Sequence, residues 1–207
     1  TPASLAGTYG TFTFNTTSGA WTYTLDQSLA DHLTAGQHVT DTLTVASFDG
    51  TATYPIVVNI TGSNDFATIT ASAAEDTAVS EAGGLANAIA NDPSASGQLT
   101  VHDVDTGEDH FATPASLAGD YGTFTFNTTT GAWTYTLDQA KADPLTDGQL
   151  VSDKLTVTSF DGTATQDIVV NITGSNDNAT ITASASDTSV TEAGGLANAS
   201  AGDPSAS

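Results

Sequence analysis

The 207-residue sequence contains no cysteine, no methionine and no arginine, and Lys141 and Lys154 are its only basic residues. Without cysteine the chain can form neither disulfides nor thiolate metal sites. The formal net charge of −22 means that the surface repels nucleic acid and anionic membranes and attracts cations. We therefore predict no nucleic-acid partner.

Long apolar runs are also missing. The longest, such as residues 168–170, are strand-sized, whereas a membrane-spanning helix needs about 20 apolar residues. We therefore predict no direct membrane insertion. Charged residues make up only 13% of the chain and apolar residues 38%, which indicates a folded domain rather than an acidic disordered tail. The lack of cysteine and methionine removes two oxidation-prone side chains, which suits exposure outside a bacterial cell, and we expect an extracellular location.

What the sequence does contain is a long internal repeat. Residues 1–65 return at 113–177, a shift of 112 positions, with 12 differences in 65 aligned positions. A period of this length corresponds to one whole domain, since solenoid repeats have only about 20–50 residues. We predict the C-terminal part of a truncated repeat at 1–65, a complete repeat at 66–177, and the N-terminal strands of the next repeat at 178–207. Tandem arrays of this kind usually set length, spacing or valency.

The hydrophobic pattern of each repeat is that of β-strands. Phe12 and Phe14 alternate with threonine, a polar turn with glycine follows, and Trp21, Tyr23 and Leu25 resume the alternation, which is typical of a hairpin with one apolar face. Equivalent short strands recur through the period, about seven in each. The sequence therefore predicts an all-β fold of tandem antiparallel β-sandwich domains. We expect the two tryptophans to be core anchors rather than sugar-stacking platforms.

Acidic residues gather in one loop. Asp103, Asp105, Glu108 and Asp109 fall within seven positions, where like charges repel unless a cation separates them. Ca²⁺ takes 6–8 oxygen ligands, so we predict a calcium site from this loop and the interdomain linker, although a merely solvated loop has the same composition. Asp49 and Asp161 each precede glycine, and we assign them to turns rather than to metal binding.

The order of segments resembles the VCBS repeat, which occurs in large secreted bacterial adhesins of the RTX type. The segments that carry the resemblance are ATITAS, ASGQLTVHDVDTGEDHF, YGTFTFNTTTGAWTYTLD and VVNITGSND, and it covers residues 66–177 and both flanks. It implies an immunoglobulin-like or cadherin-like sandwich, type I secretion of the parent protein and calcium at domain junctions. The resemblance also implies the calcium ligands. The linker would supply Asn64 and Asp65, and at the next junction Asn176 and Asp177. An early strand would supply Glu81 or Glu192, and a paired-aspartate loop would supply Asp103 and Asp105. The glycine-rich nonapeptides of the calcium β-roll are absent from this sequence.

We therefore predict a structural extender, or stalk, of an extracellular adhesin or surface fibre that calcium rigidifies. The alternative is a carbohydrate-binding or surface-binding module of the same kind of adhesin. No G-x-S-x-G, H-E-x-x-H or P-loop pattern is present, and we predict that the chain is not an enzyme.

The expected partners are neighbouring repeats of the same protein. The tail carries first-strand sequence at 179–183 and 189–192, whereas residues 1–65 match only the last 65 positions of the period. Strand donation from one chain to the next could therefore form a homopolymer.

Overall fold

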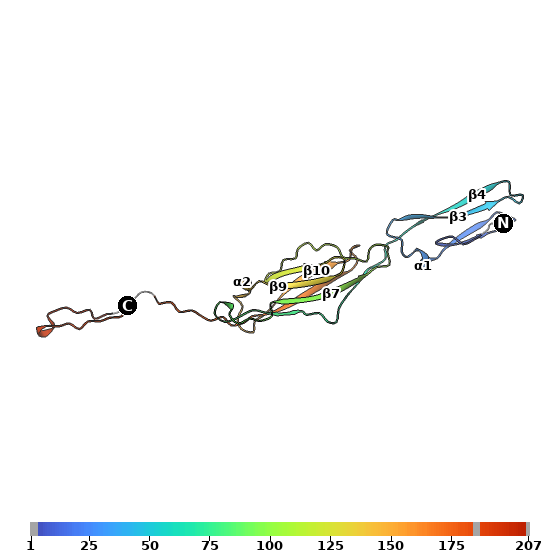
Figure 1. The fold of residues 1–207 in the computed structure, drawn as a ribbon. Helices are drawn as coiled ribbons and strands as arrows, with labels where there is room; N and C mark the ends of the chain where they lie inside the picture. The colour runs from blue at the N-terminus through green and yellow to red at the C-terminus, as the bar shows by residue number, and fades with distance from the viewer. Residues whose placement is uncertain (1–3, 184–186, 206–207) are drawn as a thin grey trace.

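The computed structural model describes residues 4–183 and 187–205. Two β-rich modules and a thin tail follow one another along an extended chain (Figure 1). We call residues 4–65 module 1, residues 66–177 module 2, and the described residues from 178 onward the tail. The helices in the described part have only three or four residues, and none is long and apolar enough to cross a membrane.

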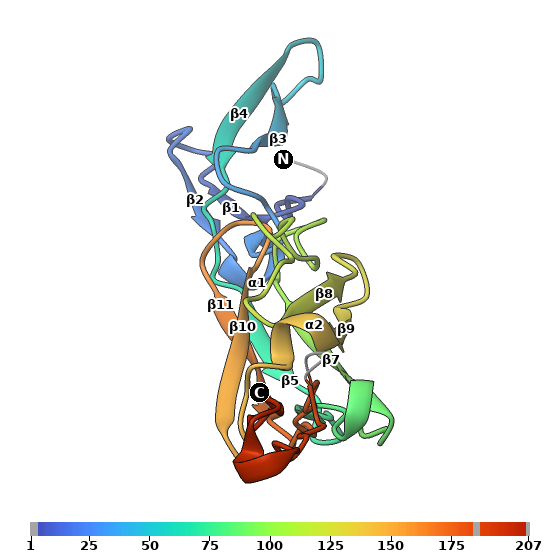
Figure 2. The same cartoon turned by 90° about the vertical axis from the view of Figure 1, so that its left-hand side faces the viewer.

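Module 2 is a two-layered β-sandwich. A four-stranded sheet has the order β5-β7-β9-β8 and a three-stranded sheet the order β10-β11-β6. In Figure 2, β10 and β11 lie on one side of module 2 and β8 and β9 on the other. All pairs are antiparallel except β6 with β11, which is parallel. The first order matches the A-B-E-D sheet of immunoglobulin-type sandwiches, so the predicted all-β sandwich fold is confirmed. The elements are β5 (Thr68–Ala71), β6 (Ala78–Ser80), η1 (Leu85–Asn87), β7 (Ser94–His102), β8 (Gly122–Phe126), β9 (Ala132–Leu137), α2 (Gln139–Ala142), β10 (Leu150–Thr158) and β11 (Thr165–Thr173).

The core of module 2 follows from the alternation in its strands. In β9, Trp133, Tyr135 and Leu137 are buried while the intervening threonines are exposed. Their side chains pack with Phe124 of β8 and with aliphatic residues of the facing sheet, in one cluster of 17 buried residues. Burial of each large apolar side chain stabilises the fold by about 1.5–3 kcal/mol, so this cluster holds the two sheets together.

One carboxylate lies inside this core and is fully hydrogen-bonded. Asp153 of β10 accepts the Tyr135 hydroxyl at 2.7 Å and the backbone N–H groups of Asp120 and Tyr121 at 2.9 and 3.0 Å. Burial and the bond to Asp153 raise the pKa of Tyr135. A Cβ at Gly119 would collide with the Asp153 carboxylate, so the backbone approaches this closely only because residue 119 is glycine.

Module 1 repeats the second part of this sandwich. It contains β1 (Gly10–Phe14), β2 (Trp21–Leu25), α1 (Gln27–Ala30), β3 (His38–Ala46) and β4 (Thr53–Thr61). The strands form two separate two-stranded sheets, β1-β2 and β3-β4. Its central cluster has three buried residues, Phe12, Leu43 and Ile56. Trp21 is 45% exposed, whereas its counterpart Trp133 is 1% exposed, because β9 pairs with β7 and β2 has no such neighbour among the described residues.

The tail forms no regular strand over residues 178–183 and 187–205, which differs from the strands expected there. It has isolated bridges at Thr191↔Asp203 and Gly194↔Ser200 and the short helix η2 (Leu196–Asn198). In module 2, β5 and β6 become strands by pairing with β7 and β11. Their counterparts in the tail have no strand beside them, and a lone strand cannot satisfy its backbone groups.

Candidate metal centre at the module junction

The acidic loop 103–109 is shaped by its own hydrogen bonds. It begins directly after β7 and turns back at Gly107, where φ is +86°. Asp103 Oδ1 accepts the backbone N–H of Asp105 at 2.9 Å, and Asp109 Oδ1 accepts that of Asp103 at 2.7 Å. Asp103 and Asp105 are both buried, with 4% and 1% exposure.

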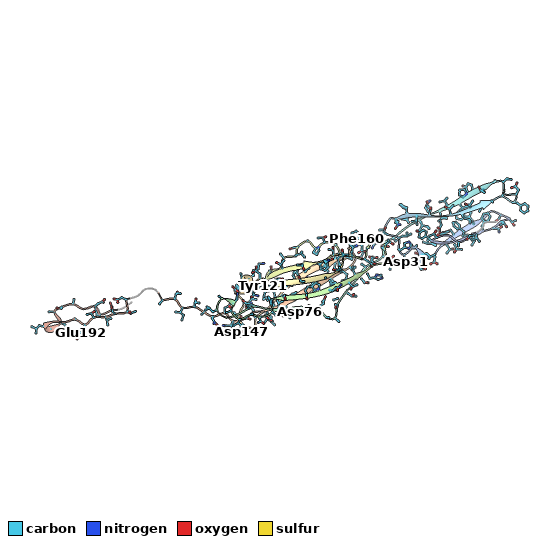
Figure 3. All side chains as sticks on the ribbon, viewed as in Figure 1. Asp31, Asp76, Tyr121, Asp147, Phe160 and Glu192 are labelled. Atoms are coloured by element: carbon cyan, nitrogen blue, oxygen red, sulfur yellow. The ribbon has the colours of Figure 1, made fainter. Side chains whose placement is uncertain are left out.

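Hydrogen bonds connect the linker after β4 to this loop and to the turn between β10 and β11. The backbone N–H of Asp65 donates to Asp105 Oδ2 at 3.0 Å, and Asn64 Nδ2 donates to Asp161 Oδ2 at 3.0 Å. The N–H of Thr106 donates to the His32 carbonyl of module 1 at 3.1 Å. The end of module 1 is therefore hydrogen-bonded to acidic side chains of module 2. In Figure 3, Asp31 labels the module 1 side of this junction and Phe160 the module 2 side.

Three carboxylates converge at the junction. Asp103, Glu108 and Asp161 each offer an oxygen within 4.8 Å of the others. With Asp105 and Asp65 they form what we call the junction cluster. Burial, and then the charges of Asp105 and Asp103, raise the pKa of Glu108. Burial and the neighbouring charge of Asp105 likewise raise the pKa of Asp65.

A second acidic group lies at the opposite end of module 2. Glu81, Asp143 and Asp177 place carboxylate oxygens within 4.8 Å of one another, and Glu81 is fully buried. Burial and then the charges of Asp177 and Asp143 raise the pKa of Glu81, although the backbone N–H of Ser175 opposes this. By the 112-residue shift, Asp143 and Asp177 correspond to Asp31 and Asp65 of module 1.

The unsatisfied atoms point to a cation. In the described residues, four buried side-chain polar atoms lack a hydrogen-bond partner: Glu81 Oε1, Asp103 Oδ2, Asp105 Oδ1 and Glu108 Oε2. All four are carboxylate oxygens of these two acidic groups. Buried carboxylates without a donor are costly, and the neighbourhood supplies further anions instead of donors. Clustered carboxylate oxygens are the ligands of hard cations such as Ca²⁺, so the residues present fit such an ion.

The structure gathers most of the residues that the sequence had indicated. Asp103, Asp105, Glu108 and Asp65 belong to the junction cluster. Asn64 borders it through its amide nitrogen. Glu81 and Asp177 form the second group, beside Asn176, whose Nδ2 donates to the Asp177 carbonyl at 3.1 Å.

Two indicated residues lie elsewhere. Asp109 turns its Oδ1 to the Asp103 N–H and to His102, so it shapes the loop. Glu192 lies exposed in the tail, away from both acidic groups.

Two members were missed by sequence reasoning. Asp161 was assigned to a turn, and it does accept the Ser159 hydroxyl at 2.6 Å and the Thr163 N–H. The other carboxylate oxygen of Asp161 accepts the amide of Asn64. Burial acts to raise the pKa of Asp161, but these hydrogen bonds outweigh it and lower the pKa. Asp143, which ends the single turn of α2, carried no local signal. Only the packing of distant loops at one end of the sandwich brings these residues to the carboxylates.

Without calcium, the melting temperature is expected to rise as the pH falls from 7 towards about 4.5. The folded-state pKa values of Glu81, Glu108 and Asp65 are raised, so the native state binds more protons than the unfolded chain in this window. Below about pH 4 the trend reverses, because carboxylates with lowered pKa values, such as Asp41 and Asp109, must then be protonated.

Calorimetry in EDTA across pH 3–8 measures this profile. The same series with calcium should lose the rise, since a bound dication holds the carboxylates ionised. A melting temperature in EDTA that falls steadily from pH 7 to 5 would contradict the prediction.

Comparison with known proteins gives only slight likenesses. No protein-family model and no curated protein matches the chain. Among solved structures, the Protocadherin GammaB4 extracellular domain aligns at 13% identity over 79% of this chain and 24% of its own, with a TM-score of 0.39. An endo-fucoidan hydrolase of glycoside hydrolase family 107 aligns at 16% identity over 85% and 23%, with a TM-score of 0.29. The chain thus spans about a quarter of the length of either.

Proposed function

We propose that this chain is a non-catalytic spacer from the stalk of a large secreted bacterial adhesin, in which Ca²⁺ at the junctions stiffens a row of sandwich modules. The observation that carries the proposal is the set of unpartnered buried carboxylate oxygens at the module ends. The near-exact return of residues 1–65 at 113–177 supports the spacer role, because repetition adds length without adding a new site. The resemblance to VCBS repeats supports the extracellular setting.

The stiffening follows from where the ligands come from. Asp65 belongs to the linker, Asp103, Asp105 and Glu108 to the loop after β7, and Asp161 to the turn between β10 and β11. An ion held by all three segments ties the linker to module 2 and removes its freedom to bend. Extracellular calcium modules have a Kd of about 10⁻⁴–10⁻³ M, so calcium outside a cell would load the junction while cytosolic calcium would not.

Small-angle X-ray scattering of the 207-residue chain tests this role. In millimolar calcium we expect a longer maximum dimension and a narrower distribution of lengths than in EDTA. The Asp105→Asn/Glu108→Gln double variant should scatter alike in both buffers. Asp167→Asn is a matched control, because Asp167 is exposed on β11 and contacts Lys154 and Thr156. It should respond to calcium like the parent chain. Equal scattering of the parent with calcium and EDTA would overturn the proposed stiffening.

A further inference from the structure

Module 2 lies between module 1 and the tail, so a pull along the chain reaches it at residues 66 and 177 (Figure 1). The first strands after residue 66 are β5 and β6, and the last strand before residue 177 is β11. β5 pairs with β7, whereas β6 pairs directly with β11. We call the contact between residues 77–84 and residues 171–177 the latch, because it joins the incoming end of the module to its outgoing end.

The direction of this pairing decides how it carries a mechanical load. β6 is parallel to β11, with Ala78–Ser80 opposite Asn171–Thr173. A pull at residues 66 and 177 therefore draws the two strands in opposite directions along their own axes. The evenly spaced hydrogen bonds of a parallel ladder are then loaded together. A pull that separates two strands at one end would instead break their bonds one after another.

Backbone hydrogen bonds extend the latch past the three paired residues at both ends. The Asn171 N–H donates to the Thr77 carbonyl at 2.8 Å, before β6 begins. The Gly84 N–H donates to the Asn176 carbonyl at 2.9 Å, beyond the end of β6. A Cβ at Gly83 would lie 2.9 Å from the Asn176 carbonyl oxygen, so the two backbones approach this closely only because residue 83 is glycine.

Side chains reinforce the latch. Glu81 Oε2 accepts the Ser175 N–H at 2.9 Å, and the Ser175 hydroxyl donates to the Glu81 carbonyl at 2.7 Å. Val79 is only 3% exposed and belongs to the core cluster of module 2, as does Ile172, its partner in the ladder. Sliding β6 along β11 therefore breaks polar contacts and draws an apolar side chain out of the core at the same time.

The pairing of β5 with β7 cannot replace the latch. No side chain of β5 is buried, and only Ile69 is partly buried. Detaching β5 from β7 would lengthen the chain ahead of β6, yet it would leave β6 paired with β11. The sandwich then stays closed until the latch gives way.

We propose that the latch carries the mechanical load of module 2 and keeps the sandwich closed when the chain is pulled from its two ends. Unfolding under tension would begin when β6 slides along β11 out of its register. The proposal rests on the proposed spacer role for its biological use, since a stalk is pulled along its length. It goes beyond stiffening, because resistance to bending at a junction and resistance to unfolding within a module depend on different contacts.

Single-molecule force spectroscopy in two pulling directions tests the latch. Two double-cysteine chains share the attachment point Asn178→Cys, and the other point is Phe66→Cys in one chain and Leu85→Cys in the other. The parent has no cysteine, and all three positions are exposed. The first chain loads the latch along its strands, whereas the second separates the strands at the end beside Gly84.

In EDTA, we expect the first chain to need about twofold more force or higher, because the ladder bonds share the load along the strands and break in turn when the strands are separated. All substitutions in this comparison are at exposed positions, so the fold should be retained in both chains. Equal forces in the two directions would overturn the latch.

A latch variant and a core variant separate resistance to force from equilibrium stability. In the chain pulled at residues 66 and 178, Val79→Ala should speed unfolding at constant force about tenfold, since buried apolar atoms are lost from the contact that breaks first. Leu137→Ala is the matched control: Leu137 is 5% exposed in the same core cluster, but β9 pairs with neither β6 nor β11.

Leu137→Ala should lower the equilibrium stability at least as much as Val79→Ala, yet speed unfolding under force less than about threefold. Urea unfolding measures the equilibrium loss of both variants. A Val79→Ala chain that unfolds under force no faster than the parent, or a Leu137→Ala chain that unfolds as fast as Val79→Ala, would overturn the proposal.

These results separate the latch from the calcium role, because the latch needs no ion and is measured in EDTA. High resistance along the strands, in a chain whose scattering does not respond to calcium, supports the latch and sinks the proposed stiffening. Calcium that stiffens a chain with equal forces in the two directions sinks the latch and leaves the proposed function standing.

Discussion

In 10 mM calcium, the melting temperature of module 2 is expected to lie about 10 °C above its value in EDTA. A site with a Kd of about 10⁻⁴ M would stabilise the folded state by about 2.7 kcal/mol at this concentration. For a unit of this size, each kcal/mol raises the melting temperature by roughly 4 °C. The physical reason is that the ion gives partners to the carboxylate oxygens of Asp103, Asp105 and Glu108 that have none within the chain.

Differential scanning calorimetry measures this shift in melting temperature. A double variant shows whether the shift depends on the junction cluster. Asp105→Asn/Glu108→Gln should melt higher than the parent in EDTA, because two like charges are gone, yet gain clearly less from calcium, since only the second acidic group of module 2, around Glu81, is left intact. Asp167→Asn should keep the full calcium response, since it removes one charge away from the junction cluster. A calcium shift below about 2 °C in the parent, or an undiminished shift in the double variant, would contradict the prediction.

Asp153→Ala is expected to remove about 3–5 kcal/mol from the stability of module 2, a large part of the total for one domain. The substitution leaves the buried Tyr135 hydroxyl and two backbone N–H groups without an acceptor, and it opens a void beside Gly119. Tyr135→Phe removes only one of the three hydrogen bonds and should cost about 1–2 kcal/mol. Urea unfolding followed by tryptophan fluorescence measures both, because the buried Trp133 reports on module 2.

Module 1 supplies the matched control. Asp41 accepts the Tyr23 hydroxyl at 2.6 Å and the N–H groups of Thr8 and Tyr9 at 2.8 and 2.9 Å, which is the same arrangement. Asp41→Ala should therefore destabilise module 1 and leave the transition of module 2 where it is. An Asp153→Ala chain within 1 kcal/mol of the parent would show that the buried carboxylate does not hold the sandwich.

The alternation of apolar and polar residues was enough to predict the strands. Trp133, Tyr135 and Leu137 fall on one face of β9 because side chains alternate along any strand, whatever the rest of the fold. The acidic loop was equally visible, since Asp103, Asp105 and Glu108 are neighbours in sequence. The same reasoning predicted strands in the tail, and the described part of the tail has none. A strand forms only where another backbone pairs with it.

The sequence by itself determined the repeat period, the β class and the acidic loop, because each depends on residues close together in the chain or on direct repetition. Only the tertiary structure decided which carboxylates meet. Asp161 and Asp103 are 58 positions apart, and Glu81 and Asp177 are 96 apart, and both pairs form because the sandwich gathers distant loops at its two ends. Trp21 and Trp133 have almost the same local sequence and opposite exposure, since burial depends on the strands that pack against a residue and not on the residue alone.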